Sequence, residues 1–116
     1  MKVVILPEVE DYLKDLGRIL YEYEYFGFED DAIEYIEDLI LDIKKSLPIR
    51  QHKPAPEYFK DFVDLELAEY LEYAVFKKNR RTSWYAFFTT YEEEETGEDI
   101  YLVCYIANNH TVAQHL

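Results

Sequence analysis

The strongest structural constraint in this sequence is the stretch from Tyr73 to Tyr91, YAVFKKNRRTSWYAFFTTY. Two runs rich in aromatic and β-branched residues flank a polar break at residues 77–81. Such runs favour a pleated, half-buried surface, and the asparagine-centred break favours a turn. We therefore predict a β-hairpin with strands at 73–78 and 83–91. The rest of the chain has to be arranged around this hairpin.

Two amphipathic helices are predicted before the hairpin, at residues 8–26 and 29–46. Pro7-Glu8 is a typical helix start, Gly27 a typical stop, and Lys44-Lys45 with Pro48 typical of the second helix end. The short connection predicts an antiparallel helical hairpin. Its apolar stripes, at helical spacing, are Val9, Tyr12, Leu13, Leu16, Ile19, Leu20 and Tyr23 in the first helix, and Ala32, Ile33, Ile36, Leu39, Ile40, Ile43 and Leu47 in the second.

Two further strands are predicted, at residues 2–6 and 99–106. Alternation in the last strand predicts that Ile100, Leu102, Cys104 and Ile106 share one face, with Tyr101, Val103 and Tyr105 on the other. Residues 49–57 are expected to be loop or extended, and residues 58–72 to hold a short helix. The fold class is α+β, in the order β-α-α-β-β-β, with the helical hairpin packed on a small, mainly antiparallel sheet. Residues 1–116 form a single domain, in which 58–72 is an insertion or a divergent segment.

The amino-acid composition limits the class of protein and the cellular compartment that we expect. A chain of 116 residues with 49% hydrophobic residues can bury more than half of its unfolded surface. The single cysteine, Cys104, excludes an internal disulfide framework and fits a reducing compartment, and its place in a strand favours a buried structural thiol. Val3–Leu6 is too short for a signal peptide, and no apolar stretch approaches membrane-spanning length. We expect a cytoplasmic protein with no membrane partner.

The charge distribution restricts where an anion can bind. The formal net charge is -13, yet residues 43–81 hold nine basic and six acidic side chains. So acidic a surface disfavours non-specific nucleic-acid binding, which depends on phosphate neutralisation. Four of the twelve basic residues lie in the hairpin turn, at Lys77, Lys78, Arg80 and Arg81. Cations at such a turn also occur simply as edge protection. No histidine or carboxylate pair has metal-ligand spacing, and the acidic turn at 92–99 lacks EF-hand spacing, so we predict no metal and no cofactor.

In the order and spacing of these elements the chain resembles the RelE/ParE toxin superfamily of bacterial type II toxin–antitoxin (plasmid stabilization) systems. The resemblance spans nearly the whole chain. The features that carry it are the opening strand with its helical hairpin, Ala32-x-x-Tyr35-Ile36-x-x-Leu39 running to Leu47-Pro48, the strand Trp84-Tyr85-Ala86-Phe87-Phe88, and the final strand 101–106 with its polar tail.

The resemblance implies a toxin that acts as a metal-independent mRNA endonuclease of RelE type and is held inactive by a cognate antitoxin. RNA cleavage needs a proton acceptor, a proton donor and cations for the phosphate. The implied catalytic residues are Lys77, Lys78, Arg80 and Arg81, with His110 and His115 in the tail, where the family often keeps a catalytic Tyr or His. The implied substrate-binding residues are Trp84, Tyr85, Asn108 and Asn109. A substrate phosphate is then expected between the turn and the tail histidines.

A second reading stays open, in which the same fold serves as a non-catalytic binding module. The family's nucleases usually carry an arginine where this strand has Tyr85, and often carry basic residues where this chain has Asn108-Asn109. The module would be a gyrase-directed toxin of ParE type or a member that only pairs with a partner protein. The target, ribosome-bound mRNA or gyrase, and a homodimeric state are left open. Charge complementarity predicts that the antitoxin segment bound to this chain is basic.

Overall fold

The computed structural model describes residues 1–22, 29–78, 80, 82–109 and 115–116. The elements, in chain order, are β1 (Lys2–Ile5), α1 (Pro7–Glu22), α2 (Glu29–Ser46), a 3-10 turn η1 (Leu47–Ile49), β2 (Lys53–Pro54), α3 (Glu57–Lys60), α4 (Leu65–Ala68), β3 (Glu72–Lys77), β4 (Ser83–Glu92) and β5 (Asp99–Asn108). Within these residues no helix is long and apolar enough to cross a membrane.

The strands that the structure describes form one sheet in the order β1-β5-β4-β3-β2. Only the pair β1–β5 is parallel, with Val3 opposite Tyr101, and the other pairs are antiparallel. The predicted hairpin is confirmed, since Phe76 pairs with Trp84 and Lys77 with Ser83. The α+β class and the mainly antiparallel sheet are therefore confirmed.

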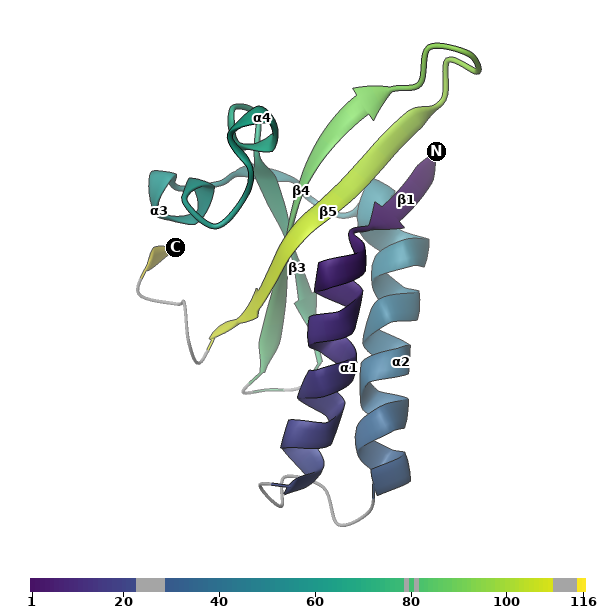
Figure 1. The fold of residues 1–116 in the computed structure, drawn as a ribbon, viewed down its shortest axis with the longest axis vertical. Coiled ribbons are helices and arrows are strands. Elements are labelled where there is room, and N and C mark those ends of the chain that lie inside the picture. Colours follow the sequence, from purple (N-terminus) through teal and green to yellow (C-terminus); the bar gives the residue numbers. More distant parts are fainter. Residues whose placement is uncertain (23–28, 79, 81, 110–114) are drawn as a thin grey trace.

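The helical hairpin covers one face of the sheet, as Figure 1 shows, and we call this the helix face. Leu13 of α1 and Leu39 of α2 are fully buried there against Phe76 and Phe88 of the sheet. Gly17 allows the helices to approach closely, because a Cβ at this position would lie 3.3 Å from Cγ1 of Ile36. The predicted bounds of α2 are confirmed, and α1 is described to Glu22. The predicted continuation to residue 26, Tyr23 and the stop at Gly27 lie outside the described residues.

Two side chains predicted on the buried stripes are exposed, Tyr12 at 45% and Ile33 at 43%. Both lie at the margin of a stripe, next to residues that are buried, Leu13 and Ala32. An apolar stripe is wider than the surface a neighbour covers, so its margins can face solvent. The assignment of Tyr12 and Ile33 to the core was wrong.

The opposite face of the sheet is covered in part by residues 55–71, and we call it the second face (Figure 1). Phe59 is fully buried there and stacks on Phe87 with 4.3 Å between ring centroids. The short helix predicted within 58–72 is present as the single turn α4, and a second single turn, α3, precedes it. The backbone N–H of Ala55 donates to the carbonyl of Leu71 at 2.9 Å. A continuous 15-residue helix would hold its ends about 22 Å apart, so this closure requires a break.

A β-bulge changes the predicted faces of β5. Phe87 pairs with Tyr105 and Phe88 with Val103, so Cys104 is an extra residue in β5. The bulge places Cys104 and Tyr105 together on the second face, while Val103 and Ile106 pack on the helix face. The predicted strict alternation was wrong because one extra residue exchanges the two faces from that point onward.

Candidate functional site: a basic edge of the sheet

The β3–β4 turn and the end of β5 lie side by side. The backbone N–H of Lys78 donates to the Thr82 carbonyl at 3.0 Å and closes the turn. Trp84 pairs with Asn108, and the N–H of Ser83 donates to Oδ1 of Asn109 at 2.9 Å. The antiparallel arrangement of β4 and β5 therefore brings the two predicted asparagines to the cation-bearing turn.

The cations of the turn point in different directions. Lys77 is exposed and alternates with Ala74 and Phe76, which places it on the second face. Lys78 is half-buried, and its Nζ lies 5.8 Å from the centroid of the Tyr35 ring on α2. Arg80 is exposed. Arg81 lies outside the described residues. The turn thus presents cations along the sheet edge rather than into a single pocket.

The structure adds two cations that sequence reasoning did not assign. β2 pairs with β3 only at Tyr73 and Glu72, through Lys53 and Pro54. Next to it is a cavity of about 280 Å³ lined by Arg50, Gln51, Lys53 and Val75. A water takes about 30 Å³, so a phosphate group with bound waters fits. The excess of basic over acidic residues in 43–81 was the sequence signal that could have pointed to these two cations. We call Arg50, Lys53, Lys77, Lys78 and Arg80 the basic edge.

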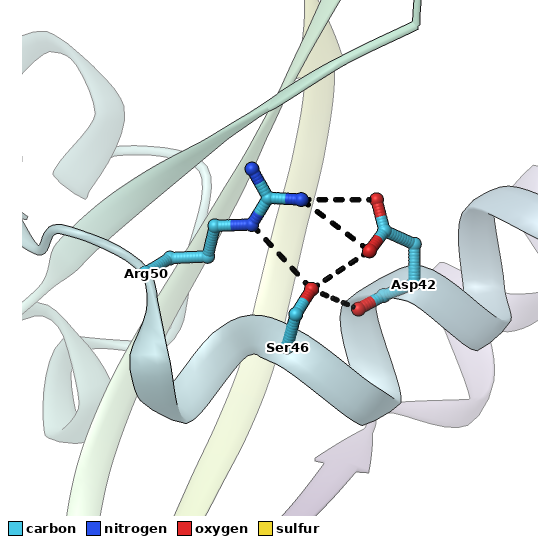
Figure 2. Close-up of polar contacts among 3 residues, drawn as sticks. All are labelled: Asp42, Ser46 and Arg50. Carbon is cyan, nitrogen blue, oxygen red and sulfur yellow. Dashed lines mark hydrogen bonds and ion pairs between the residues drawn. The ribbon is translucent and has the colours of Figure 1, made fainter.

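Arg50 is held in place by the end of α2 (Figure 2). Its Nη2 donates to Oδ2 of Asp42 at 3.3 Å, and its Nε donates to Oγ of Ser46 at 3.4 Å. The Ser46 hydroxyl in turn lies 2.6 Å from the Asp42 carbonyl and 2.7 Å from Asp42 Oδ1, and its one proton serves one of these acceptors at a time. The guanidinium also lies 4.8 Å from the Phe76 ring centroid. Asp42 offsets part of the Arg50 charge, so Lys53 and the turn supply most of the positive potential.

Trp84 does not lie at this surface. Its side chain is 2% exposed, within the helix-face core, and its Nε1 donates to the Tyr35 hydroxyl at 2.9 Å. The prediction that Trp84 contacts substrate does not fit this position. Trp84 has a packing role instead, because its large ring is buried in the core and its one polar atom is hydrogen-bonded to the Tyr35 hydroxyl.

Tyr85 is half-buried on the second face, opposite Val75 and Ala107. Its ring centroid lies 6.0 Å from that of Tyr73 in an edge-to-face arrangement. Lys77 follows Val75 on the same face, so Tyr85 and Lys77 are diagonal neighbours across β3 and β4. An aromatic face beside a cation suits a nucleobase with its phosphate.

The histidines do not gather at the basic edge. His115 stacks on Tyr58, with 3.6 Å between centroids, and lies 6.5 Å from Phe59, which itself stacks on Phe87. Phe87 lies three residues from Trp84 along β4, about 10 Å at the rise of a strand. The structure therefore places His115 against α3 and not beside the turn, because Tyr58 offers an open ring for stacking. His110 lies outside the described residues.

His52 follows Gln51 of the cavity lining but has a packing role. Its Nε2 lies 2.8 Å from the Leu47 carbonyl oxygen, so this nitrogen carries the proton. Its ring packs edge-on against Phe88 at 4.7 Å and against Tyr101 at 5.9 Å. The contacts fix the loop that carries Arg50 and Lys53.

We expect Cys104 to be inert in the folded protein. Burial raises the pKa of its thiol from 9.0 to about 11, with smaller contributions from the charges of Asp64 and Glu8. Alkylation by iodoacetamide at pH 8 should therefore be on the order of a hundredfold slower than in guanidinium, since only the thiolate reacts. The higher pKa in the folded state also means that stability should fall as pH rises from 9 to 11. Equal alkylation rates in the folded and denatured protein would contradict this.

Within the described residues no group of three or more histidine, cysteine, aspartate or glutamate side chains is placed to hold a metal ion. Comparison with known proteins finds no matching protein family, no matching curated protein and no matching solved structure. The features of this chain that bear on its function are therefore the fold, the basic edge and the sequence's resemblance to the RelE/ParE superfamily.

Proposed function

We propose that this chain is the toxin of a type II toxin–antitoxin pair and a metal-independent endoribonuclease that cleaves ribosome-bound mRNA in the cytoplasm. The observation that carries the proposal is the basic edge, on a chain of net charge -13, joined to Asn109 through the hydrogen bond from Ser83. Among the other residues that the structure describes, acidic side chains outnumber basic ones. An RNA strand is therefore favoured at this edge.

The residues have distinct roles in this proposal. Lys77 and Arg80 neutralise the charge that develops on the cleaved phosphate, Lys78 adds positive potential from beside Tyr35, and Arg50 and Lys53 hold a neighbouring phosphate in the 280 Å³ cavity. Tyr85 stacks on a base. His110 follows Asn109 directly in the sequence and is assigned the proton transfer. His115, stacked on Tyr58, has no catalytic role.

The test is expression of the wild-type chain alone from an inducible promoter. We expect growth arrest and cleavage of ribosome-bound mRNA, mapped by primer extension. The His110→Gln variant should lose most of the cleavage and its pH dependence, whereas His115→Gln is the matched control and should retain both. If the wild-type chain neither slows growth nor cleaves mRNA on the ribosome, the nuclease proposal fails.

A non-catalytic binding module is the second candidate, and the position of His115 favours it. Both histidines whose side chains are described, His52 and His115, contact aromatic rings of the fold, away from the cations of the turn. A module of this kind would pair with a partner protein or act on gyrase. A gyrase supercoiling assay with the purified chain separates these cases. Inhibition of supercoiling without RNA cleavage would identify a ParE-type toxin.

A further inference from the structure

A second cavity, separate from the basic edge, is rich in aromatic side chains. It encloses about 500 Å³, within the range of small-molecule sites. Its aromatic lining comes from three parts of the chain: Tyr12 of α1, Tyr58 and Phe62 at α3, and Tyr105 of β5. In Figure 1, β5 runs between α1 and α3. In the part of the chain that the structure describes, none of the lining residues belongs to the basic edge, so the cavity is a distinct candidate site.

Three of these rings form a wall that is fixed by its own contacts. Phe62 stacks on Tyr105 with 5.1 Å between ring centroids, and it meets Tyr58 edge-on at 5.2 Å. His115, which does not line the cavity, stacks on Tyr58 at 3.6 Å and holds this ring in place. Tyr58 and Phe62 are nevertheless 41% and 47% exposed. Because these accessible rings are ordered before anything binds, a ligand loses little free energy in arranging them.

The fourth ring, that of Tyr12, stands apart from this wall. Within the described residues no aromatic ring contacts that of Tyr12, which is 45% exposed. Burial raises the pKa of Tyr105, and the phenol groups of Tyr12 and Tyr58 raise it further. The three phenol groups therefore gather at one cavity, although the Tyr12 ring touches neither of the others. This arrangement leaves a gap between the Tyr12 ring and the wall.

The charge at the cavity is negative. Glu8 lines it and is exposed, and among the described residues the lining holds no lysine, arginine or histidine. Burial is the main cause that raises the pKa of the Cys104 thiol in the lining, and the charges of Asp64 and Glu8 raise it further. Two carboxylates, one from α1 and one from the N-cap of α4, thus act on the same place. Both would attract a cation in the cavity.

The lining favours one class of cation over the others. Aromatic rings next to carboxylates are typical of sites for organic cations, which the ring quadrupoles attract. A metal ion is disfavoured, because no group of three or more histidine, cysteine, aspartate or glutamate side chains within the described residues is placed to hold one. A primary ammonium group carries three N–H donors, which need acceptors when water is removed. A quaternary ammonium group has no N–H donor, so a mainly aromatic lining with the Glu8 carboxylate suits it better.

We propose that this cavity binds a small molecule with a quaternary ammonium group, whose methyl groups contact Tyr12, Tyr58 and Phe62 and whose charge faces Glu8. Nucleotides and other anions are disfavoured here by the same carboxylates, so the two candidate sites of the chain take ligands of opposite charge. The proposal holds whether or not the basic edge cleaves RNA.

The experiment compares two probes of the same shape by NMR titration of the intact protein. The first is choline, and the second is dimethylbutanol, the uncharged isostere in which carbon replaces the nitrogen. We expect choline to bind about tenfold more tightly, because only the charged probe gains the attraction of the rings and of Glu8. Nuclear Overhauser contacts from the choline methyl protons should reach the rings of Tyr12 and Phe62. Equal affinity of the two probes, no binding of choline, or contacts only to other residues would overturn the proposal.

Variants of the lining then test the individual residues. Tyr12→Ala and Phe62→Ala should each weaken choline binding severalfold, whereas Tyr12→Phe keeps the ring and should bind as the wild type does. Glu8→Gln should weaken binding at low salt and have less effect at high salt. Tyr70→Ala is the matched control, because Tyr70 is an exposed aromatic residue, at 74%, that does not line the cavity.

Tyr12 and Phe62 are about half exposed, so their truncation should leave the melting temperature near that of the wild type. The comparison of the two probes on the wild-type chain needs no variant at all. Wild-type affinity for choline in both Tyr12→Ala and Phe62→Ala would contradict the proposed site. None of these results bears on RNA cleavage.

Discussion

Replacing Trp84 with alanine should destabilise the protein by about 3–5 kcal/mol, the usual cost of removing a large aromatic ring from a core. Trp84 is 2% exposed and packs among fully buried residues such as Phe76 and Phe88. The cavity that its loss leaves lies between the helical hairpin and the sheet, where neither layer can collapse without moving the other. Urea unfolding followed by far-UV circular dichroism gives the free energy of unfolding.

Two conservative variants separate packing from hydrogen bonding at this position. Tyr35→Phe removes the acceptor 2.9 Å from Trp84 Nε1 and leaves a buried donor, at a cost of about 1–3 kcal/mol. Trp84→Phe keeps most of the ring and should cost less than Trp84→Ala. The double variant Tyr35→Phe/Trp84→Phe should cost less than the two single changes together, because the bond can be lost only once. A loss below about 1 kcal/mol for Trp84→Ala would contradict the core position.

Local chemistry in the sequence was enough to predict the main elements. The aromatic runs on either side of residues 77–81 predicted the β3–β4 hairpin with end errors of about one residue. Lys44, Lys45 and Pro48 marked the end of α2 correctly. These signals succeed because capping, turn formation and apolar periodicity act over a few neighbouring residues.

Features fixed by distant contacts were not predictable in this way. The break between α3 and α4 depends on the bond from Ala55 to Leu71, and the bulge at Cys104 depends on the register of β5 with β4. No glycine marks the bulge in the sequence. The alternation rule therefore failed where the fold, rather than the local sequence, sets which face a residue occupies.

The candidate site also contains some residues that could be predicted from the sequence and others whose positions depend on distant contacts. The family resemblance implied that the turn cations and Asn109 belong to one site. The structure brings them side by side, because β4 and β5 are antiparallel and the Ser83 N–H donates to Oδ1 of Asn109. The sequence did not predict Arg50 and Lys53, whose position depends on the pairing of Lys53 with Tyr73. It placed His115 at the turn, whereas stacking on Tyr58 holds the ring at α3.

The triple variant Lys53→Ala/Lys77→Ala/Arg80→Ala should abolish growth arrest and ribosome-dependent cleavage. All three side chains are exposed, and each is proposed to contact phosphate. Binding of a single-stranded RNA oligonucleotide should weaken, and the slope of log K against log salt should become shallower by about 2, since each lost phosphate contact contributes roughly 0.7. The melting temperature should change little, because exposed cations contribute little to stability.

The matched control is Lys2→Ala/Lys14→Ala/Lys45→Ala, which removes the same charge from exposed positions on β1, α1 and α2. Both variants make an already acidic chain more acidic by three charges, so a general repulsion of RNA would impair them equally. A local site at the basic edge predicts loss in the first variant and near wild-type cleavage in the control. Equal loss in both would mean that net charge, not this edge, governs RNA binding. Full activity in the first variant would exclude the basic edge as the place where the phosphate is bound.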